Sequence, residues 1–109
     1  MDTETMTRIE LQARIVYVIS EVGGRMYKVG ISKNFNSLGR RLQNLQTGNP
    51  RQLSIIHTFE YQADGEAYKI EQETIKAFSF YQLGVTGDWF ELEGSNSLVQ
   101  FITNGTKPL

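Results

Sequence analysis

Hydrophobic and polar residues alternate along two short segments, 14–20 and 25–31, that lie on either side of Gly23-Gly24. Both segments are rich in β-branched and aromatic residues, and two such segments around a Gly-Gly pair predict a β-hairpin. An even loop centred on the glycines would pair Tyr17 with Gly30. The alternation would then bury one face, which carries Val16, Val18, Tyr27, Val29 and Ile31.

The opposite face of this hairpin carries the residues of chemical interest. Tyr17, Ile19, Lys28 and Gly30 share it, with Ile19 opposite Lys28. Tyr17 and Lys28 then become diagonal neighbours, within reach of each other across the two strands. Gly30, which has no side chain, is expected to leave space in front of Tyr17 for another group to approach.

A helical period follows the hairpin. Asn36 or Ser37 is expected to cap a helix that runs to about Thr47 and stops at Gly48. Its apolar stripe contains Leu38, Leu42 and Leu45. At about 100° per residue, Arg41 lies at the edge of this stripe and is directed toward the sheet, whereas Arg40 points to solvent or to a ligand.

The rest of the chain predicts a third strand, a second long helix, a short strand or turn, and a closing helix. Asp64 is expected to cap the long helix and Gly84 to end it. The expected ranges are, in order, 53–61, 65–82, 85–92 and 95–102. Together they predict one α+β domain over residues 13–103, with an antiparallel sheet of about three strands flanked by helices, a flexible leader over 1–12 and a tail over 104–109.

Composition limits the classes of protein that the chain can belong to. Its 109 residues include no cysteine and one histidine, His57, which excludes disulfides and thiolate metal sites. No apolar segment approaches the ~20 residues of a membrane span, and the first ten residues are too polar for a signal peptide. We therefore expect a soluble, cytoplasmic protein that makes no contact with a membrane.

Charge is unevenly distributed. The chain has a formal net charge of −1, but residues 22–59 contain no acid and six basic side chains: Arg25, Lys28, Lys33, Arg40, Arg41 and Arg51. A segregated basic segment is typical of contact with a polyanion, and a solvated basic surface is the plainer alternative. We expect one positive concavity with Lys28, Arg40 and Arg41 near its floor, and phosphate contacts from Arg25, Lys33, Arg40 and Arg51.

Several short strings, in their order along the chain, resemble the GIY-YIG endonuclease superfamily, over roughly residues 15–92. Ile15-Val-Tyr17 stands at the place of the GIY tripeptide, and Lys28-Val-Gly30 at the place of YIG. Arg40-Arg-Leu42 resembles the first helix of that family. Ile70-Glu71 and Asp88-Trp-Phe90 resemble its small phage and fungal branch, which uses a KIG-like second tripeptide.

The resemblance implies a DNA endonuclease that uses one divalent metal ion, Mg²⁺ or alternatively Mn²⁺. By position, Tyr17 would orient or deprotonate the nucleophile, Arg41 would bind the scissile phosphate, and Lys28 would contact a phosphate. Periodicity leaves open whether Glu71 or Glu73 faces the hairpin, and the resemblance selects Glu71 as the metal ligand. Sequence specificity would be weak unless a protein partner or the shape of the DNA supplies it.

Some positions depart from that pattern and keep a second function open. Lys28 replaces the tyrosine of YIG and cannot form a phenolate, Leu45 stands where many members have a histidine, and Asn96 is only a positional match for a late asparagine. These differences favour a catalytically silent protein that binds nucleic acid, or that inhibits or recruits a nucleic-acid enzyme. An oligomerisation module, a third class, would need an exposed apolar patch.

Overall fold

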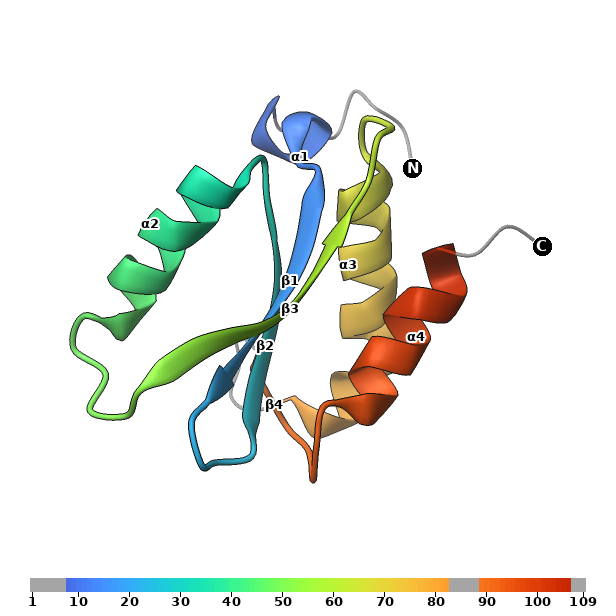
Figure 1. Cartoon of the computed structure of the whole chain (residues 1–109). Coiled ribbons are helices and arrows are strands. Elements are labelled where there is room, and N and C mark those ends of the chain that lie inside the picture. The colour runs from blue at the N-terminus through green and yellow to red at the C-terminus, as the bar shows by residue number, and fades with distance from the viewer. Residues whose placement is uncertain (1–7, 83–88, 107–109) are drawn as a thin grey trace.

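The structure is a computed structural model that describes residues 8–82 and 89–106. The elements follow one another in the order helix, hairpin, helix, strand, helix, 3₁₀ turn, strand and helix (Figure 1). Their bounds are α1 Arg8–Gln12, β1 Ile15–Glu21, β2 Met26–Ser32, α2 Phe35–Gln46, β3 Leu53–Glu60, α3 Glu66–Ala77, η2 Ser79–Tyr81, β4 Trp89–Glu91 and α4 Asn96–Thr106.

The sheet is antiparallel throughout, with the strand order β3-β1-β2-β4. The hairpin has the predicted register, because Tyr17 pairs with Gly30 and Ile19 with Lys28. The expectation of about three strands was too low. The fourth strand, β4, is only three residues long and pairs Trp89 with Lys28 at the outer edge of β2.

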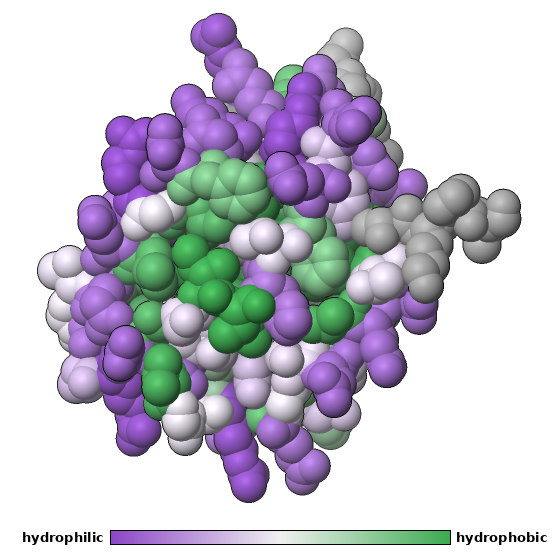
Figure 2. All heavy atoms as spheres, viewed as in Figure 1, coloured by the Kyte–Doolittle hydropathy of each residue, from purple (hydrophilic) through white to green (hydrophobic). Residues whose placement is uncertain are grey.

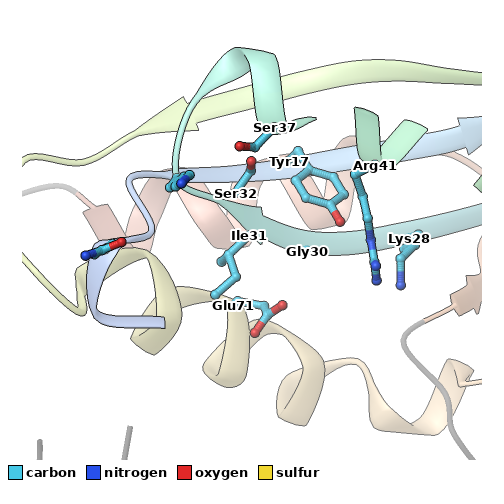
Figure 3. A pocket seen from close by; sticks show the side chains of 10 residues that line it. Tyr17, Lys28, Gly30, Ile31, Ser32, Ser37, Arg41 and Glu71 are labelled. Carbon is cyan, nitrogen blue, oxygen red and sulfur yellow. The ribbon is translucent and has the colours of Figure 1, made fainter. Parts of the chain in front are cut away.

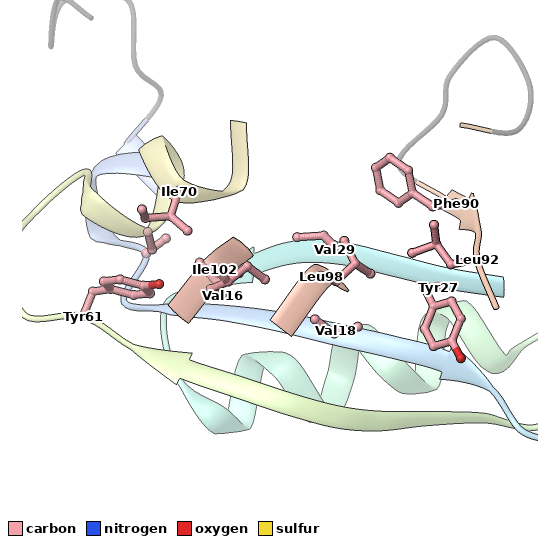
Figure 4. Packing of buried hydrophobic residues seen from close by; sticks show 12 residues of the cluster. Val16, Val18, Tyr27, Val29, Tyr61, Ile70, Phe90, Leu92, Leu98 and Ile102 are labelled. Atoms are coloured by element: carbon pink, nitrogen blue, oxygen red, sulfur yellow. The ribbon is translucent and has the colours of Figure 1, made fainter. Parts of the chain in front are cut away.

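Helices cover both faces of the sheet (Figure 1). One face packs against α3 and α4 in a cluster that contains four of the five predicted hairpin core residues and others, among them Ala67, Ile70, Leu98 and Ile102 (Figure 4). The fifth, Ile31, is only partly buried and packs against this cluster. The other face, which carries Tyr17, is buried as well. There a smaller cluster forms beneath α2 from Ile15, Tyr17, Ile19, Leu38 and Leu53. The chemically interesting face of the hairpin thus becomes an interior between sheet and helix.

A β-bulge in β3 changes which side chains share a face. Val18 pairs with His57 but the next residue, Ile19, pairs with Ile55, so Ile56 is the extra residue. The alternation of faces along β3 is therefore interrupted at Ile56. Uninterrupted alternation would place His57 and Ile55 on the same face of the sheet, but the bulge places them on opposite faces. His57 stacks on Phe59, with ring centroids 6.4 Å apart, and it lies outside the site described below.

The helix ends differ from those predicted. Asn34, rather than Asn36 or Ser37, caps α2, because its side-chain oxygen accepts a hydrogen bond of 2.8 Å from the backbone N–H of Ser37. Gly65 occupies the cap position of α3 at φ 78°, and Asp64 instead forms an ion pair with Arg14. The helical coil of α3 ends at Ala77 and a 3₁₀ turn follows, whereas the predicted stop at Gly84 lies outside the described residues.

The chain ends also differ in part from expectation. A short helix, α1, occupies 8–12 within the expected leader, and α4 continues into the expected tail, as far as Thr106.

Hydrophobic side chains gather in the middle of the face shown in Figure 2, around the edge strand β3, where Ile55, Ile56 and Phe59 are only partly buried. None of the helices in the described ranges combines the length and apolar character needed to cross a bilayer.

Candidate nucleic-acid cleavage site

Four elements surround one hollow of about 450 Å³ between the sheet, α2 and α3 (Figure 3). Tyr17 comes from β1, Lys28 from β2, Arg41 from α2 and Glu71 from α3. These are the four residues that the sequence singled out for catalysis, and they are far apart along the chain. The complete lining is Gln12, Tyr17, Lys28, Gly30, Ile31, Ser32, Lys33, Ser37, Arg41 and Glu71.

Tyr17 is held in place by the glycine opposite it. A Cβ atom at Gly30 would lie 2.9 Å from Cε1 of Tyr17, and closer still to Cζ and the hydroxyl. The tyrosine ring therefore lies against the bare backbone of β2, and it is only 1% exposed. Gly30 leaves space beside its backbone, as the sequence predicted, but the ring of Tyr17 fills that space in place of an incoming group. Its hydroxyl remains at the wall of the hollow (Figure 3).

The adjacent arginines of α2 have different positions. Leu38 is buried against the sheet, and Arg41, less than one turn later, lines the hollow. In Figure 3 the side chains of Arg41 and Lys28 run alongside each other, next to the ring of Tyr17. Both arginines are exposed, but Arg41 lines the hollow and Arg40 does not, so the structure separates them as the helical period predicted. The expectation that Arg40 lies near the floor of the same concavity was wrong.

Lys28 is unusually buried for a lysine, with 3% of its surface exposed. Its ammonium lies 5.9 Å from the centroid of the Trp89 ring, within the range of a cation–π interaction. This contact exists because β4 places Trp89 directly beside Lys28 in the sheet. Sequence patterns did not predict it, since nothing in the Asp88-Trp-Phe90 string indicates which strand it joins.

Glu71 provides the acidic wall. Ile70 and Thr74 of α3 are buried against the sheet, which turns Glu71 toward the hollow and leaves Glu73 exposed to solvent. The side-chain amide of Gln72 donates a 2.9 Å hydrogen bond to Oε1 of Glu71. Within residues 8–82 and 89–106, no cluster of three or more acidic, histidine or cysteine side chains is arranged to hold a metal ion.

Charge is therefore divided across the hollow. Lys28, Lys33 and Arg41 line the side formed by β2, α2 and the loop between them, and Glu71 lies on the α3 side. Carboxylates also surround Tyr68, near the start of α3. Burial raises the pKa of Tyr68, and the carboxylates of Glu10 and Glu71 raise it further. A ligand with an anionic group and a bound cation would match both walls.

The remaining basic residues do not join one concavity, contrary to expectation. Arg25 lines a separate hollow that also includes Asn96, at the start of α4. Arg51 forms an ion pair with Glu21, with Nη1 and Oε1 3.5 Å apart. Of the four residues predicted to contact phosphate, Lys33 alone lines the hollow that contains Tyr17. The positive wall is thus smaller than the acid-free segment suggested, because the fold distributes its side chains over different surfaces.

Three polar residues of the hollow were not identified from the sequence. Ser32 is 7% exposed and its hydroxyl donates a 2.9 Å hydrogen bond to the backbone oxygen of Asn34, which fixes the turn into α2. Ser37 and Gln12 also line the hollow. The sequence signal that could have found the serines is their position on either side of the cap residue, Asn34.

Comparison with known families identifies the chain. Residues 14–104 match the model of the T5orf172 domain, so the protein belongs to the T5orf172 domain family. The family inferred from the tripeptide strings, GIY-YIG, was therefore wrong, because the model that matches nearly the whole domain is a different one. No curated protein and no solved structure matches the chain.

Proposed function

We propose that this member of the T5orf172 domain family hydrolyses phosphodiester bonds in nucleic acid, with DNA as the substrate, at the hollow lined by Tyr17, Lys28, Arg41 and Glu71. The observation that carries the proposal is the convergence of two cations, a phenol and a carboxylate from four separate elements on one cavity.

The cationic wall suits a phosphodiester. Arg41 presents a planar guanidinium that can bind two phosphate oxygens at once, and the buried ammonium of Lys28 acts as a point charge beside it. Such charges, held in place before the substrate arrives, stabilise the extra negative charge that develops on phosphorus oxygens during hydrolysis. Lys33, at the rim, would hold a neighbouring phosphate.

Tyr17 is the group best placed to act on the nucleophile. Its ring is fixed by Gly30 and by burial, so its hydroxyl has little freedom to leave the hollow. In hydrolysis a water oxygen bonds to phosphorus, one P–O ester bond breaks, and the departing alkoxide ends with a proton. The Tyr17 hydroxyl would hold the attacking water by a hydrogen bond and relay the proton that this water releases.

A divalent metal fits the acidic wall only in part. Glu71 offers one carboxylate, and Mg²⁺ commonly binds proteins through one or two carboxylates while keeping several waters and substrate phosphate oxygens. Glu71 would therefore hold the ion weakly until the substrate contributes further oxygens. Bound there, Mg²⁺ or Mn²⁺ would neutralise charge on the phosphate and lower the pKa of a bound water.

One observation favours a second function, binding without cleavage. Lys28 places a buried positive charge in the same hollow as Glu71 and would oppose the entry of a second cation. A protein of this kind would hold a phosphate between Lys28 and Arg41 and carry out no hydrolysis. Its role would be to recruit or inhibit another enzyme of nucleic acid.

A cleavage assay separates the two functions. Purified protein would be incubated with supercoiled, single-stranded and branched DNA, with Mg²⁺, Mn²⁺ or a chelator, and products would be resolved on denaturing gels. The proposal expects metal-dependent cleavage of at least one form. Binding of DNA without cleavage of any form, in either metal, would establish the second function instead.

A further inference from the structure

A smaller hollow, the second hollow, lies beside Trp89, which is the strand partner of Lys28. It has a volume of about 370 Å³ and is lined by Glu21, Met26, Leu45, Asn49 and Trp89. Trp89 connects the two hollows, because it lines the second one and also packs near Lys28, which lines the first. Leu45 belongs to α2 and Met26 to β2, so the second hollow lies further along the same space between helix and sheet.

We propose that this second hollow binds a nucleobase, stacked on Trp89, from the nucleotide next to the phosphate held by Lys28 and Arg41. The inference rests on the proposed function for the position of that phosphate. It adds a binding site and a substrate requirement, since a base can enter the hollow only when it is unpaired. The substrate class is therefore single-stranded nucleic acid, or a strand with an exposed base.

The lining chemistry matches a base. Trp89 supplies an aromatic ring for stacking, and Met26 and Leu45 supply apolar surface for the other parts of a flat heterocycle. Glu21 supplies an acceptor for a ring or exocyclic N–H, because a carboxylate offers about four lone-pair sites and the ion pair with Arg51 uses only part of them. The amide of Asn49 adds polar groups at the rim.

The geometry between the hollows matches one nucleotide. The Lys28 ammonium is 5.9 Å from the Trp89 centroid, so the cation that would hold a phosphate and the ring that would hold a base are neighbours. A nucleotide carries its phosphate and its base on one sugar, so these two groups are neighbours as well. Glu21 also has a negative charge that would repel a second phosphate from this hollow, which favours a base there over more backbone.

Tryptophan fluorescence can report on this hollow, because Trp89 is the only tryptophan of the sequence. A short single-stranded oligonucleotide would be titrated into the full protein at low salt with a chelator, to prevent cleavage. Tryptophan emission reports stacking, and the anisotropy of a labelled oligonucleotide reports binding separately. An oligomer of the same length and charge made of abasic sites serves as the comparison. We expect quenching by the base-bearing strand and none by the abasic strand.

Variants test the same site by affinity. Trp89→Leu should weaken binding of the base-bearing strand roughly 5- to 150-fold, the usual range for loss of one stacked base. It should weaken binding of the abasic strand much less, because that strand can lose affinity only through the contact between Trp89 and Lys28. Trp89→Phe keeps an aromatic ring and the fold of β4, so it should retain most of the affinity even if the leucine variant folds poorly. Phe80→Leu removes an aromatic ring that is 91% exposed on η2 and should change neither signal.

The outcomes distinguish this inference from the proposed hydrolysis. Binding with equal quenching by both strands, or with none by either, would overturn the base site and leave the hydrolysis proposal standing. An absence of binding at low salt would overturn the base site as well. Base-dependent quenching in a protein that cuts no DNA would support the base site and count against hydrolysis.

Discussion

Gly30 and Tyr17 face each other across the first two strands, and the missing side chain of Gly30 is what allows the Tyr17 ring to lie against the backbone of β2. The closest ring atoms of Tyr17 occupy the volume where any Cβ at position 30 would stand. This pairing sets the position of the hydroxyl in the hollow, so the geometry of the candidate site depends on a residue that has no functional group.

Gly30→Ala should therefore displace Tyr17 and destabilise the protein. Overpacking of a filled interior costs about 1–3 kcal/mol, and the displaced ring should also reduce any cleavage activity. Chemical denaturation would measure the free energy of unfolding. In a Tyr17→Leu background the same glycine substitution should cost less, because the atoms it collides with are gone.

Gly39→Ala is the matched control for this experiment. Gly39 lies in α2, and a Cβ atom there would have no neighbouring atom within 4 Å, so alanine should stabilise the helix by about 0.5–1 kcal/mol. If Gly30→Ala behaved like Gly39→Ala, the account of the Tyr17 position would be wrong.

The two arginines of α2 offer a comparison between neighbours. Arg41→Ala removes a guanidinium from the hollow and should lower cleavage at saturating DNA by at least about 100-fold, the scale for loss of one group that stabilises a transition state. Arg40→Ala removes the same group from a position outside the hollow and should reduce only DNA affinity, by a few fold. Single-turnover cleavage rates and binding titrations on both variants would check this. Equal losses of rate would contradict the separate roles.

Tyr61 gives a prediction about stability. Its hydroxyl is buried and makes no hydrogen bond to any residue in the described part of the chain. Removing it in Tyr61→Phe relieves a desolvated polar group and should raise the free energy of unfolding at neutral pH by about 1 kcal/mol. Tyr81→Phe, at a side chain that is 47% exposed, should change it little. A clear destabilisation by Tyr61→Phe would show that the hydroxyl has a partner.

The same residue should make the protein sensitive to alkali. Burial, with a smaller contribution from Glu66, raises the pKa of Tyr61 from 10.0 to about 12. Between these values the folded protein keeps a proton that the unfolded chain has released, so stability falls as pH rises through this window. Denaturation at a series of pH values should show a shallower decline for Tyr61→Phe than for the parent protein.

Local patterns predicted the parts of the fold that depend on them. An even loop centred on Gly23-Gly24 predicted the register of Tyr17 with Gly30, and the helical period separated Arg40 from Arg41. The pairing of strands that lie far apart in the sequence could not be predicted from local patterns. A strand as short as β4 has no period to read, so its position beside Lys28 and the Trp89 contact could not be foreseen.

Interruptions of regular structure explain the other differences. The bulge at Ile56 reverses the faces of β3 because one extra residue shifts a period of two. The sequence does not distinguish Asn34 as the cap of α2, because Asn36 and Ser37 are equally good cap residues by type. Short tripeptides matched a family by position, but a model over residues 14–104 assigned the chain to another, since a few small strings carry less information than a whole domain.

The proposed hydrolysis depends most on a metal ion held by Glu71, and a comparison of Glu71 with Glu73 tests this role. Glu71 lines the hollow and Glu73 is exposed on the same helix. Each would be replaced by glutamine, and Mg²⁺-dependent cleavage of DNA would be measured beside DNA binding and thermal unfolding. The account predicts that Glu71→Gln loses cleavage while it keeps its fold and most DNA binding, and that Glu73→Gln cleaves like the parent. Cleavage by Glu71→Gln at the parental rate would contradict it.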